Sequence, residues 1–373
     1  MNNNETGEAT AQLGKVKCND CGAFLVYNIG TTTLKCEYCA SEIEIPIENT
    51  TIEDLDLDTF LSNDYITEET YQVRTVKCTE CGASTTLNPE IISDNCPYCT
   101  TPLIVANAVL ENHIKPKSLV PFLIDKKSAI EIFNDWIRSL QFAPNDLKEN
   151  GTNATEKLIG IYLPYWTFDC NTYSEYRGKR GEHYDAEETY RDSEGNAQTR
   201  KIQKTDWTEV SGSVLKKIDN TLICASNTLP KDTIQKLEPW DLNQLVEYND
   251  AFLSGLKSEQ YSIDLENGWK IAKQTIDSKI DSEIRSQIGG DEQIISYLKA
   301  NYNDKTFKHI LLPLWISAYK YKNKVYQFTI NAQTGEIQGE RPYSFWKRFR
   351  VFLIIITIIL LLMFYPKIQH FFR

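Results

Sequence analysis

The chain has 373 residues, of which 41% are hydrophobic and 24% charged, an ordinary composition that excludes wholesale disorder and leaves room for roughly two or three domains. Its formal net charge is −11, and the charge is unevenly distributed. Residues 341–373 hold six basic residues and no acidic one, which leaves 34 basic against 51 acidic residues, a net charge of −17, in residues 1–340. A body this acidic repels phosphate backbones, so general nucleic-acid binding is disfavoured.

The first 14 residues, MNNNETGEATAQLG, contain neither a basic start nor an apolar run. We therefore expect no signal peptide, and residues 1–14 are predicted to be disordered. Without export, the ten cysteines should stay reduced in the cytosol rather than form disulfides. Reduced cysteines in CxxC pairs indicate metal binding.

Two zinc ribbons are predicted next, at residues 15–47 and 74–107. They contain CNDCGAFLVYNIGTTTLKCEYC and CTECGASTTLNPEIISDNCPYC, and in each the two CxxC pairs are separated by 14 residues. Gly22 and Gly82 follow the second cysteine, where a metal knuckle needs a positive φ. Four thiolates without histidine are typical of a closed, structural Zn2+ site. The predicted ligands of the two ions are Cys18, Cys21, Cys36 and Cys39, and Cys78, Cys81, Cys96 and Cys99.

Metal binding should dominate the folding of each ribbon, because a unit of this size has almost no core. The expected contribution is on the order of 10 kcal/mol or more. The alternative metal is iron in a rubredoxin-like site, which usually has a larger separation between the cysteine pairs. Cys170 and Cys224 lack a CxxC partner, and we expect them to be buried free thiols.

An acidic linker is predicted at residues 48–73, between the ribbons. Residues 41–73 contain ten acidic residues and no Lys or Arg, and the segment DLDLDTFL carries apolar residues at helical spacing. The favoured interpretation is a solvated linker with a short helix. The alternative is an acidic docking segment for a basic partner.

Residues 108–342 are predicted to form one α+β core domain. Apolar residues at helical spacing indicate a helix in KSAIEIFNDWIRSL and a second helix from Trp269 to the glycine pair at 289–290. Residues 145–155 are typical of a loop, and IYLPYWTF at 161–168 is typical of a short strand. DSEGNAQ predicts the turn of a long hairpin, and KVYQFTINAQTGEIQG predicts two strands around a turn.

A four-residue pattern, L-P-x-W, occurs twice in this domain, at 163–166 and 312–315. Each copy follows a helical region and opens a tyrosine-rich extended segment. We therefore predict two helix-then-sheet halves related by internal duplication, with coincidence of a short pattern as the alternative. The hypothesis requires the two segments to occupy equivalent environments.

No catalytic motif is present. The four histidines, His113, His183, His309 and His370, form no HExxH, and the sequence has no GxSxG, no GxGxxG after a strand and no GxxxxGK[ST]. The polar stretch from Tyr173 to Tyr190 is expected to be the outer face of a sheet rather than a pocket. We expect no enzymatic activity, and no small-molecule substrate is identified.

A C-terminal membrane anchor is predicted at residues 343–373. Val351 to Tyr365 is a run of fifteen residues with one polar member, about 22 Å long against a hydrocarbon core of about 30 Å. The aromatic and basic flanks FWKRFR and PKIQHFFR would supply the missing length by snorkelling. The alternative is a buried core helix. We expect a tail-anchored, single-pass protein of the inner (cytoplasmic) membrane with its N-terminus in the cytoplasm and the bilayer as a partner.

The ribbons, IEDLDLDTFL, KPKSLVPF, LIGIYLPYWTFD, YRGKRGEHY and KHILLPLWISAYKYKNKVYQFTINAQTGEIQGERPYS together resemble a family of bacterial TFIIB-type zinc-ribbon membrane proteins. The resemblance covers nearly the whole chain. Members are often labelled primosomal protein N′ or helicase-like, an activity that does not carry over because the ATP-binding loop is missing. Some relatives are associated with phage-shock-type and flotillin-like membrane proteins, so the resemblance implies an adaptor at the membrane with protein partners of that kind.

Two functions follow as hypotheses. The first is a non-enzymatic, membrane-anchored adaptor or scaffold that faces the cytosol and recruits protein partners in membrane or envelope maintenance. The second is nucleic-acid binding through the ribbons, in replication or transcription. The ribbons offer only a thin basic surface for the second role, and we expect nucleic acid not to be the partner. The basic residues of this surface are Lys15, Lys17, Lys35, Arg74 and Lys77.

Overall fold

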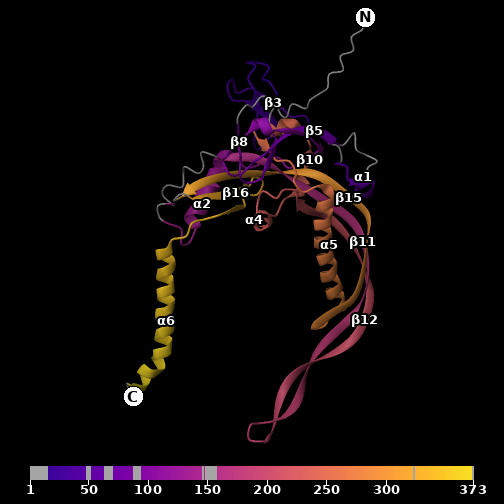
Figure 1. Ribbon diagram of the computed structural model, residues 1–373, viewed down its shortest axis with the longest axis vertical. Coiled ribbons are helices and arrows are strands. Elements are labelled where there is room, and N and C mark those ends of the chain that lie inside the picture. The colour runs from indigo at the N-terminus through magenta and orange to yellow at the C-terminus, as the bar shows by residue number, and fades with distance from the viewer. Residues whose placement is uncertain are drawn as a thin grey trace.

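The computed structural model describes residues 16–47, 52–62, 70–86, 94–144, 147, 158–321 and 324–371. The predicted disordered residues 1–14, most of the predicted loop at 145–155 and parts of the acidic linker lie outside these ranges. The fold is α+β, as predicted. Figure 1 shows an arch with a curved sheet at its top and two legs below. One leg is the C-terminal helix. The other, which we call the β arm, is formed by the outer parts of the three long strands at residues 159–191, 197–224 and 292–321.

The central sheet has nine strands among the described residues. Five follow the order β12-β11-β15-β10-β13; of the other four, β14 pairs with β11, β4 and β16 pair with β15, and β17 pairs with β16. β11 is the middle of its long antiparallel part and pairs with β12 on one side and β15 on the other. The strands are β4 (Leu55–Asp56), β10 (Ser118–Leu119), β11 (Ile159–Arg191), β12 (Ala197–Cys224), β13 (Val246–Glu247), β14 (Lys257–Ser258), β15 (Glu292–Tyr321), β16 (Lys324–Asn331) and β17 (Ile337–Gly339).

The helices confirm the sequence periodicity where it was strong. α2 (Lys126–Ser139) begins at the N-cap Asp125, and α5 (Leu265–Ile288) begins at the N-cap Asp264 and ends at Gly289, whose φ is 65°. Each N-cap carboxylate accepts a backbone N–H three residues on, which satisfies a donor left free in the first turn. The remaining helical elements are α1 (Leu57–Leu61), η1 (Val105–Asn107), α4 (Lys231–Lys236), η3 (Leu242–Gln244), η4 (Asp250–Leu253) and α6 (Phe345–Phe371).

The β arm is longer than the sequence predicted. The expected short strand at 161–168 is the first part of β11, a strand of 33 residues. β12 returns along it after the predicted turn, where Gly195 takes a φ of 85°. Helix α5 covers one face of the arm with its buried stripe of Ile276, Ile280 and Ile284. The predicted β16–β17 hairpin is also confirmed.

The two L-P-x-W segments lie side by side on the central strands. Leu163 of β11 pairs directly with Leu312 of β15, so the two copies run in opposite directions from this pair. Trp166 and Trp315 each donate an indole N–H to the carbonyl of the residue before a helix N-cap, Ile263 and Ile124 respectively. Both tryptophans are almost completely buried. The equivalent environments that the duplication hypothesis requires are therefore present.

The backbone around these segments repeats the same pattern. Ala225 donates its N–H to the Pro164 carbonyl, and Ala332 donates to the Pro313 carbonyl. In turn, the Ala225 carbonyl accepts from residues 262 and 263, and the Ala332 carbonyl accepts from residues 123 and 124. β10 runs parallel to β15 as β14 runs parallel to β11. The two halves thus meet around a local two-fold axis, and each tryptophan secures the helix of the other half.

Part of the predicted acidic linker is docked on the core. Leu57 is completely buried, and β4 pairs with β15 at Phe307. Lys308 forms ion pairs with Asp54 and Asp169, and the Lys305 amine lies 2.6 Å from an Asp58 carboxylate oxygen. Residues 52–62 are therefore not a solvated linker. Their acidic side chains dock on basic groups, but these basic groups belong to the same chain rather than to a partner.

The C-terminal helix requires a correction. Within the described part of the chain, no helix is long and apolar enough to cross a membrane. In α6 the apolar run covers only residues 351–365 and follows a first turn and a half that holds three basic residues; its length of about 22 Å is less than the bilayer's hydrocarbon core. The predicted single-pass, tail-anchored span at 343–373 and the localisation in the cytoplasmic membrane are therefore wrong.

A buried histidine leads to a pH prediction. His309 on β15 is 2% exposed and its Nδ1 lies 2.8 Å from the Ile114 carbonyl oxygen, while the rings of Trp166 and Tyr261 pack against it. Burial lowers the pKa of His309 to about 4, and the nearby His113 adds to the effect. The unfolded chain takes up this proton near pH 6.5, whereas the folded chain does not. The contribution of neutral His309 to the free energy of unfolding is therefore complete above pH 6.5 and is lost as the pH falls towards 4.

The expected loss is about 1.4 kcal/mol per pH unit, or roughly 3 kcal/mol over the window. Urea unfolding of wild type and His309→Asn should be compared at pH 7, 6, 5 and 4. The difference in unfolding free energy between them should shrink as the pH falls, because the variant lacks this titration. Comparing at matched pH cancels the acid sensitivity that both proteins share through their cysteine clusters. A constant difference would contradict the assignment.

Candidate metal centres

The first four-cysteine group lies in a ribbon of three short strands, β1 (Leu25–Asn28), β2 (Thr33–Cys36) and β3 (Glu42–Glu44). The Sγ atoms of Cys18 and Cys39 are 3.5 Å apart, and those of Cys21 and Cys36 are 3.4 Å apart. All four sulfurs lie within 4.8 Å of one another. Four thiolates at about 2.3 Å from one tetrahedral ion would be separated by about 3.8 Å, so the group could hold a metal ion.

The second group has the same geometry in β5 (Thr70–Lys77), β6 (Ser84–Thr86), β7 (Asp94–Asn95) and β8 (Pro102–Leu103), with β9 (Val109–Ile114) completing the β5 sheet. The Cys78–Cys99 and Cys81–Cys96 sulfur distances are both 3.5 Å. Gly22 and Gly82 take φ values of 76° and 77°, as the knuckle turn predicts. In both groups the predicted residues are brought together, and each could bind a metal ion.

The thiols of the two groups differ in their surroundings. Backbone N–H groups of Cys39 and Tyr38 lower the pKa of Cys36 to about 7, which favours the thiolate that a metal requires. In the second group, burial raises the pKa of Cys96, so that thiol depends more strongly on a bound cation to become a thiolate. This contrast is limited to Cys36 and Cys96, because at the last cysteine the order is reversed: hydrogen bonds from neighbouring thiols raise the pKa of Cys39 to about 12, whereas hydrogen bonds with Thr101 lower that of Cys99 to about 7.

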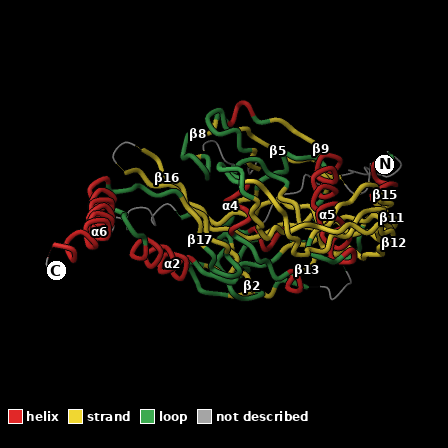
Figure 2. The backbone as a smooth tube through the Cα atoms, turned by 90° about the horizontal axis from the view of Figure 1, so that it is seen from below, coloured by secondary structure: helices red, strands yellow, loops and turns green. Residues whose placement is uncertain are grey.

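The ribbons cover opposite faces of the central sheet. Leu25, Tyr27 and Leu34 of the first ribbon join the core that contains Tyr162 and Trp315, together with helix α2. Val76 and Tyr98 of the second ribbon join the core that contains Leu163 and Leu314. Because neighbouring residues of a strand point to opposite faces, the two cores lie on either side of the sheet. Figure 2 shows β2 and β8 on opposite sides of the central strands.

The second ribbon is tied to the sheet by the knuckle itself. Tyr98, between the last two cysteines, is 1% exposed, and its hydroxyl donates to the carboxylate of Glu259. Glu259 is equally buried and also accepts from the hydroxyls of Ser226 and Thr228. Burial raises the pKa of Glu259, against the effect of these three donors. Gln327 of β16 adds a hydrogen bond to the Tyr98 carbonyl.

The equivalent tyrosine of the first ribbon is free of the core. Tyr38 occupies the same place between the last two cysteines, but it is 84% exposed. The first ribbon instead attaches through its strand β1, where the Tyr27 N–H donates to Ser254 and the nearby Gly30 N–H donates to Phe122. Its second knuckle therefore faces solvent, whereas that of the second ribbon is part of the core.

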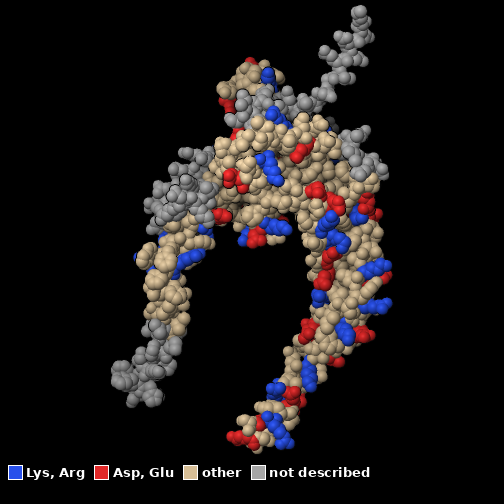
Figure 3. Space-filling model, in the orientation of Figure 1, with Lys and Arg blue, Asp and Glu red and all other residues tan. Residues whose placement is uncertain are grey.

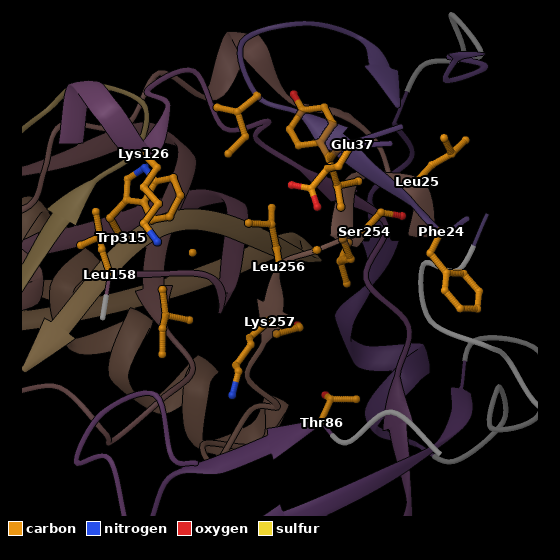
Figure 4. Close-up of a pocket in the computed structure, with 18 of the residues that line it drawn as sticks. Phe24, Leu25, Glu37, Thr86, Lys126, Leu158, Ser254, Leu256, Lys257 and Trp315 are labelled. Atoms are coloured by element: carbon orange, nitrogen blue, oxygen red, sulfur yellow. The ribbon is translucent and has the colours of Figure 1, made fainter. Parts of the chain in front are cut away.

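A cavity of about 640 Å3 lies between the first ribbon and the sheet. Its wall includes Leu256 and Trp315 from the core, Leu25 from the first ribbon and the amines of Lys126 and Lys257 (Figure 4). The Lys257 amine lies 2.7 Å from a carboxylate oxygen of Asp94, so its charge is already compensated within the protein. The described residues that line it assemble no catalytic set of side chains, and the polar stretch from Tyr173 to Tyr190 lies away from it on the β arm.

Sequence reasoning missed the Glu259 network. The spacing of cysteines marks the metal groups, but Glu259, Ser226 and Thr228 come from distant loops and match no motif. The free thiols behave as expected in part: Cys170 is buried and Cys224 is half-buried, and burial raises the pKa of Cys170 to about 11.

Together, the fold and the two sites define an α+β protein with a pair of four-cysteine ribbons, each of which could hold a metal ion, docked on the faces of one sheet. The chain is 26% identical over 243 residues to the uncharacterized protein YdjG of Bacillus subtilis (strain 168). The match covers 63% of this chain and 66% of that protein, slightly less than two thirds of its length. No family model matches the chain, and no solved structure matches it.

Proposed function

We propose that the protein is a non-enzymatic adaptor that binds two structural Zn2+ ions and uses its first ribbon to recruit a protein partner. The observation that carries the proposal is the contrast between Tyr38 and Tyr98. The same knuckle position is 1% exposed where the ribbon is built into the core and 84% exposed where it is not. A large aromatic side chain at the surface is the kind of residue that anchors protein interfaces.

Zinc is the metal that fits the donor set best. Four thiolates in a tetrahedron, with no histidine and no open position, favour a structural zinc site over a catalytic one. Iron in a rubredoxin-like site uses the same ligands and is the alternative. Elemental analysis of the purified full chain should find two zinc ions per chain. Two iron ions per chain instead would show that the sites are of the rubredoxin-like kind.

The charge of the first ribbon argues against nucleic acid as the partner. Residues 16–47 hold Lys17 and Lys35 against four acidic residues, Asp20, Glu37, Glu42 and Glu44. One of the lysines is partly engaged, because the Lys35 amine lies 3.8 Å from the Glu42 carboxylate. A surface of this kind gains little from counterion release on a phosphate backbone.

Affinity purification of the tagged full chain should test the adaptor role. We expect Tyr38→Ala to lose at least one stoichiometric protein partner that wild type retains. Tyr297→Ala, which removes an exposed tyrosine on β15 outside the first ribbon, is the matched control and should retain it. An unchanged set of partners in Tyr38→Ala would refute the role of this knuckle.

The nucleic-acid alternative should be tested on the full chain, because both ribbons pack against the core. Fluorescence anisotropy with labelled DNA and RNA at low salt should show no binding. Binding whose affinity falls steeply with salt would make nucleic acid the partner instead.

A further inference from the structure

The tip of the β arm is a two-stranded ribbon that stands alone. β15 accompanies β11 only as far as the Gly181–Glu292 pair, whereas the β11–β12 pairing continues to Arg191 and Ala197. From residue 184 to residue 204 both outer edges are therefore without a neighbouring strand among the described residues. Figures 1 and 3 show this tip projecting from the end of the arm.

Along both outer edges of this tip, the outward-facing backbone N–H and C=O groups have no partner strand among the described residues. An isolated two-stranded hairpin is only marginally stable in water. A strand edge presents a row of backbone N–H and C=O groups that another strand can pair with. The side chains here supply little packing of their own, because nearly all are exposed on both faces of the ribbon.

The two edges carry opposite charge. The β11 edge at residues 184–188 is acidic, and the β12 edge at residues 200–204 is basic. One pair is closed within the hairpin, where the Arg200 guanidinium lies 2.5 Å from the Glu188 carboxylate. Asp185 and Glu187 on one strand, and Lys201 and Lys204 on the other, form no ion pair among the described residues, although Glu187 lies directly opposite Lys201 in the hairpin register. Figure 3 shows charges of both signs at the tip.

We propose that the arm tip binds a second copy of this chain, with the basic β12 edge of one copy pairing with the acidic β11 edge of the next. Two copies standing side by side in the same direction would join these edges as antiparallel strands. Opposite charges would then face each other across the new pair. Pairing two identical edges would instead place like charges opposite, so the contact is heterologous and builds rings or chains of copies.

Charge reversal on one edge at a time tests the pairing. The first variant is Lys201→Glu with Lys204→Glu, which makes both edges acidic. The second is Asp185→Lys with Glu187→Lys, which makes both edges basic. Analytical ultracentrifugation should show wild type associating with concentration. Each variant should associate at least about tenfold more weakly, since several opposed charge pairs are lost and replaced by repulsion.

An equimolar mixture of the two variants should associate again, because each supplies the edge that the other lacks. A chain with all four substitutions should also regain association, since its edges are complementary with their signs exchanged. These two recoveries distinguish edge pairing from damage to the hairpin. Unchanged zinc content and circular dichroism provide a check on folding.

A wild type that remains a monomer at its solubility limit would overturn the proposal. Association that persists equally in both single-edge variants would also overturn it and would locate the contact elsewhere, for example on the exposed apolar residues of α6. Neither outcome bears on the recruitment of a different protein by Tyr38, so the two proposals fail separately.

Discussion

Cys96→Ser is expected to destabilise the whole sheet, while Cys36→Ser, at the matching position of the first ribbon, should have a smaller effect. Each substitution should remove one of two metal ions. Loss of the second ion frees the knuckle that holds Tyr98, and the buried Glu259 then loses one of its three donors. Exposing a tyrosine and leaving a buried carboxylate under-bonded should together cost on the order of 5 kcal/mol.

Loss of the first ion should cost less stability, because Tyr38, which matches Tyr98 in the first ribbon, is already mostly exposed. Zinc content by elemental analysis and urea unfolding followed by tryptophan fluorescence would measure both effects, since Trp166 and Trp315 report on the sheet. Both variants should retain one ion per chain. Equal losses of stability in the two variants would show that the Tyr98–Glu259 contact does not connect the second ribbon to the core.

Trp166→Ala and Trp315→Ala are each expected to lower the free energy of unfolding by about 3–5 kcal/mol, the usual cost of removing a large buried aromatic side chain. In each case a helix also loses the indole N–H that holds the carbonyl just before its N-cap. The two costs should be similar, because the tryptophans occupy equivalent positions about the local two-fold axis.

Urea unfolding of the two variants and of the double variant would measure these effects. Trp346→Ala is the control: its side chain is 71% exposed on α6 and its removal should change stability by no more than about 0.5 kcal/mol. If one buried tryptophan costs much more than the other, the halves are not energetically equivalent despite their matching contacts.

Local patterns in the sequence predicted the elements that local patterns control. The helix from residue 126 and the helix ending at Gly289 bury one stripe each, so their periodicity was visible. The cysteine groups were equally visible, since four ligands within a span of 22 residues leave few other arrangements. The L-P-x-W repeat correctly indicated that two distant segments share an environment.

Other features depend on contacts that the sequence does not mark. The outer part of β11 has no alternation of polar and apolar residues, because both faces of the arm tip are exposed. The docking of residues 52–62 depends on Lys305 and Lys308, more than two hundred positions further along. At the C-terminus, hydrophobicity suggested a membrane span, but the uninterrupted apolar run is too short for one.

The exchange of tryptophan anchors between the halves also constrains how the chain can fold during synthesis. The Trp315 side chain that secures the start of α2 is 191 positions downstream of the carbonyl it bonds, while Trp166 precedes its own partner by 97. Helix α2 can form early, but the Trp315 side chain that holds its N-terminal end is not available until β15 leaves the ribosome. Contacts this distant in sequence slow folding, so the acidic N-terminal half must wait, partly assembled, for the last third of the chain.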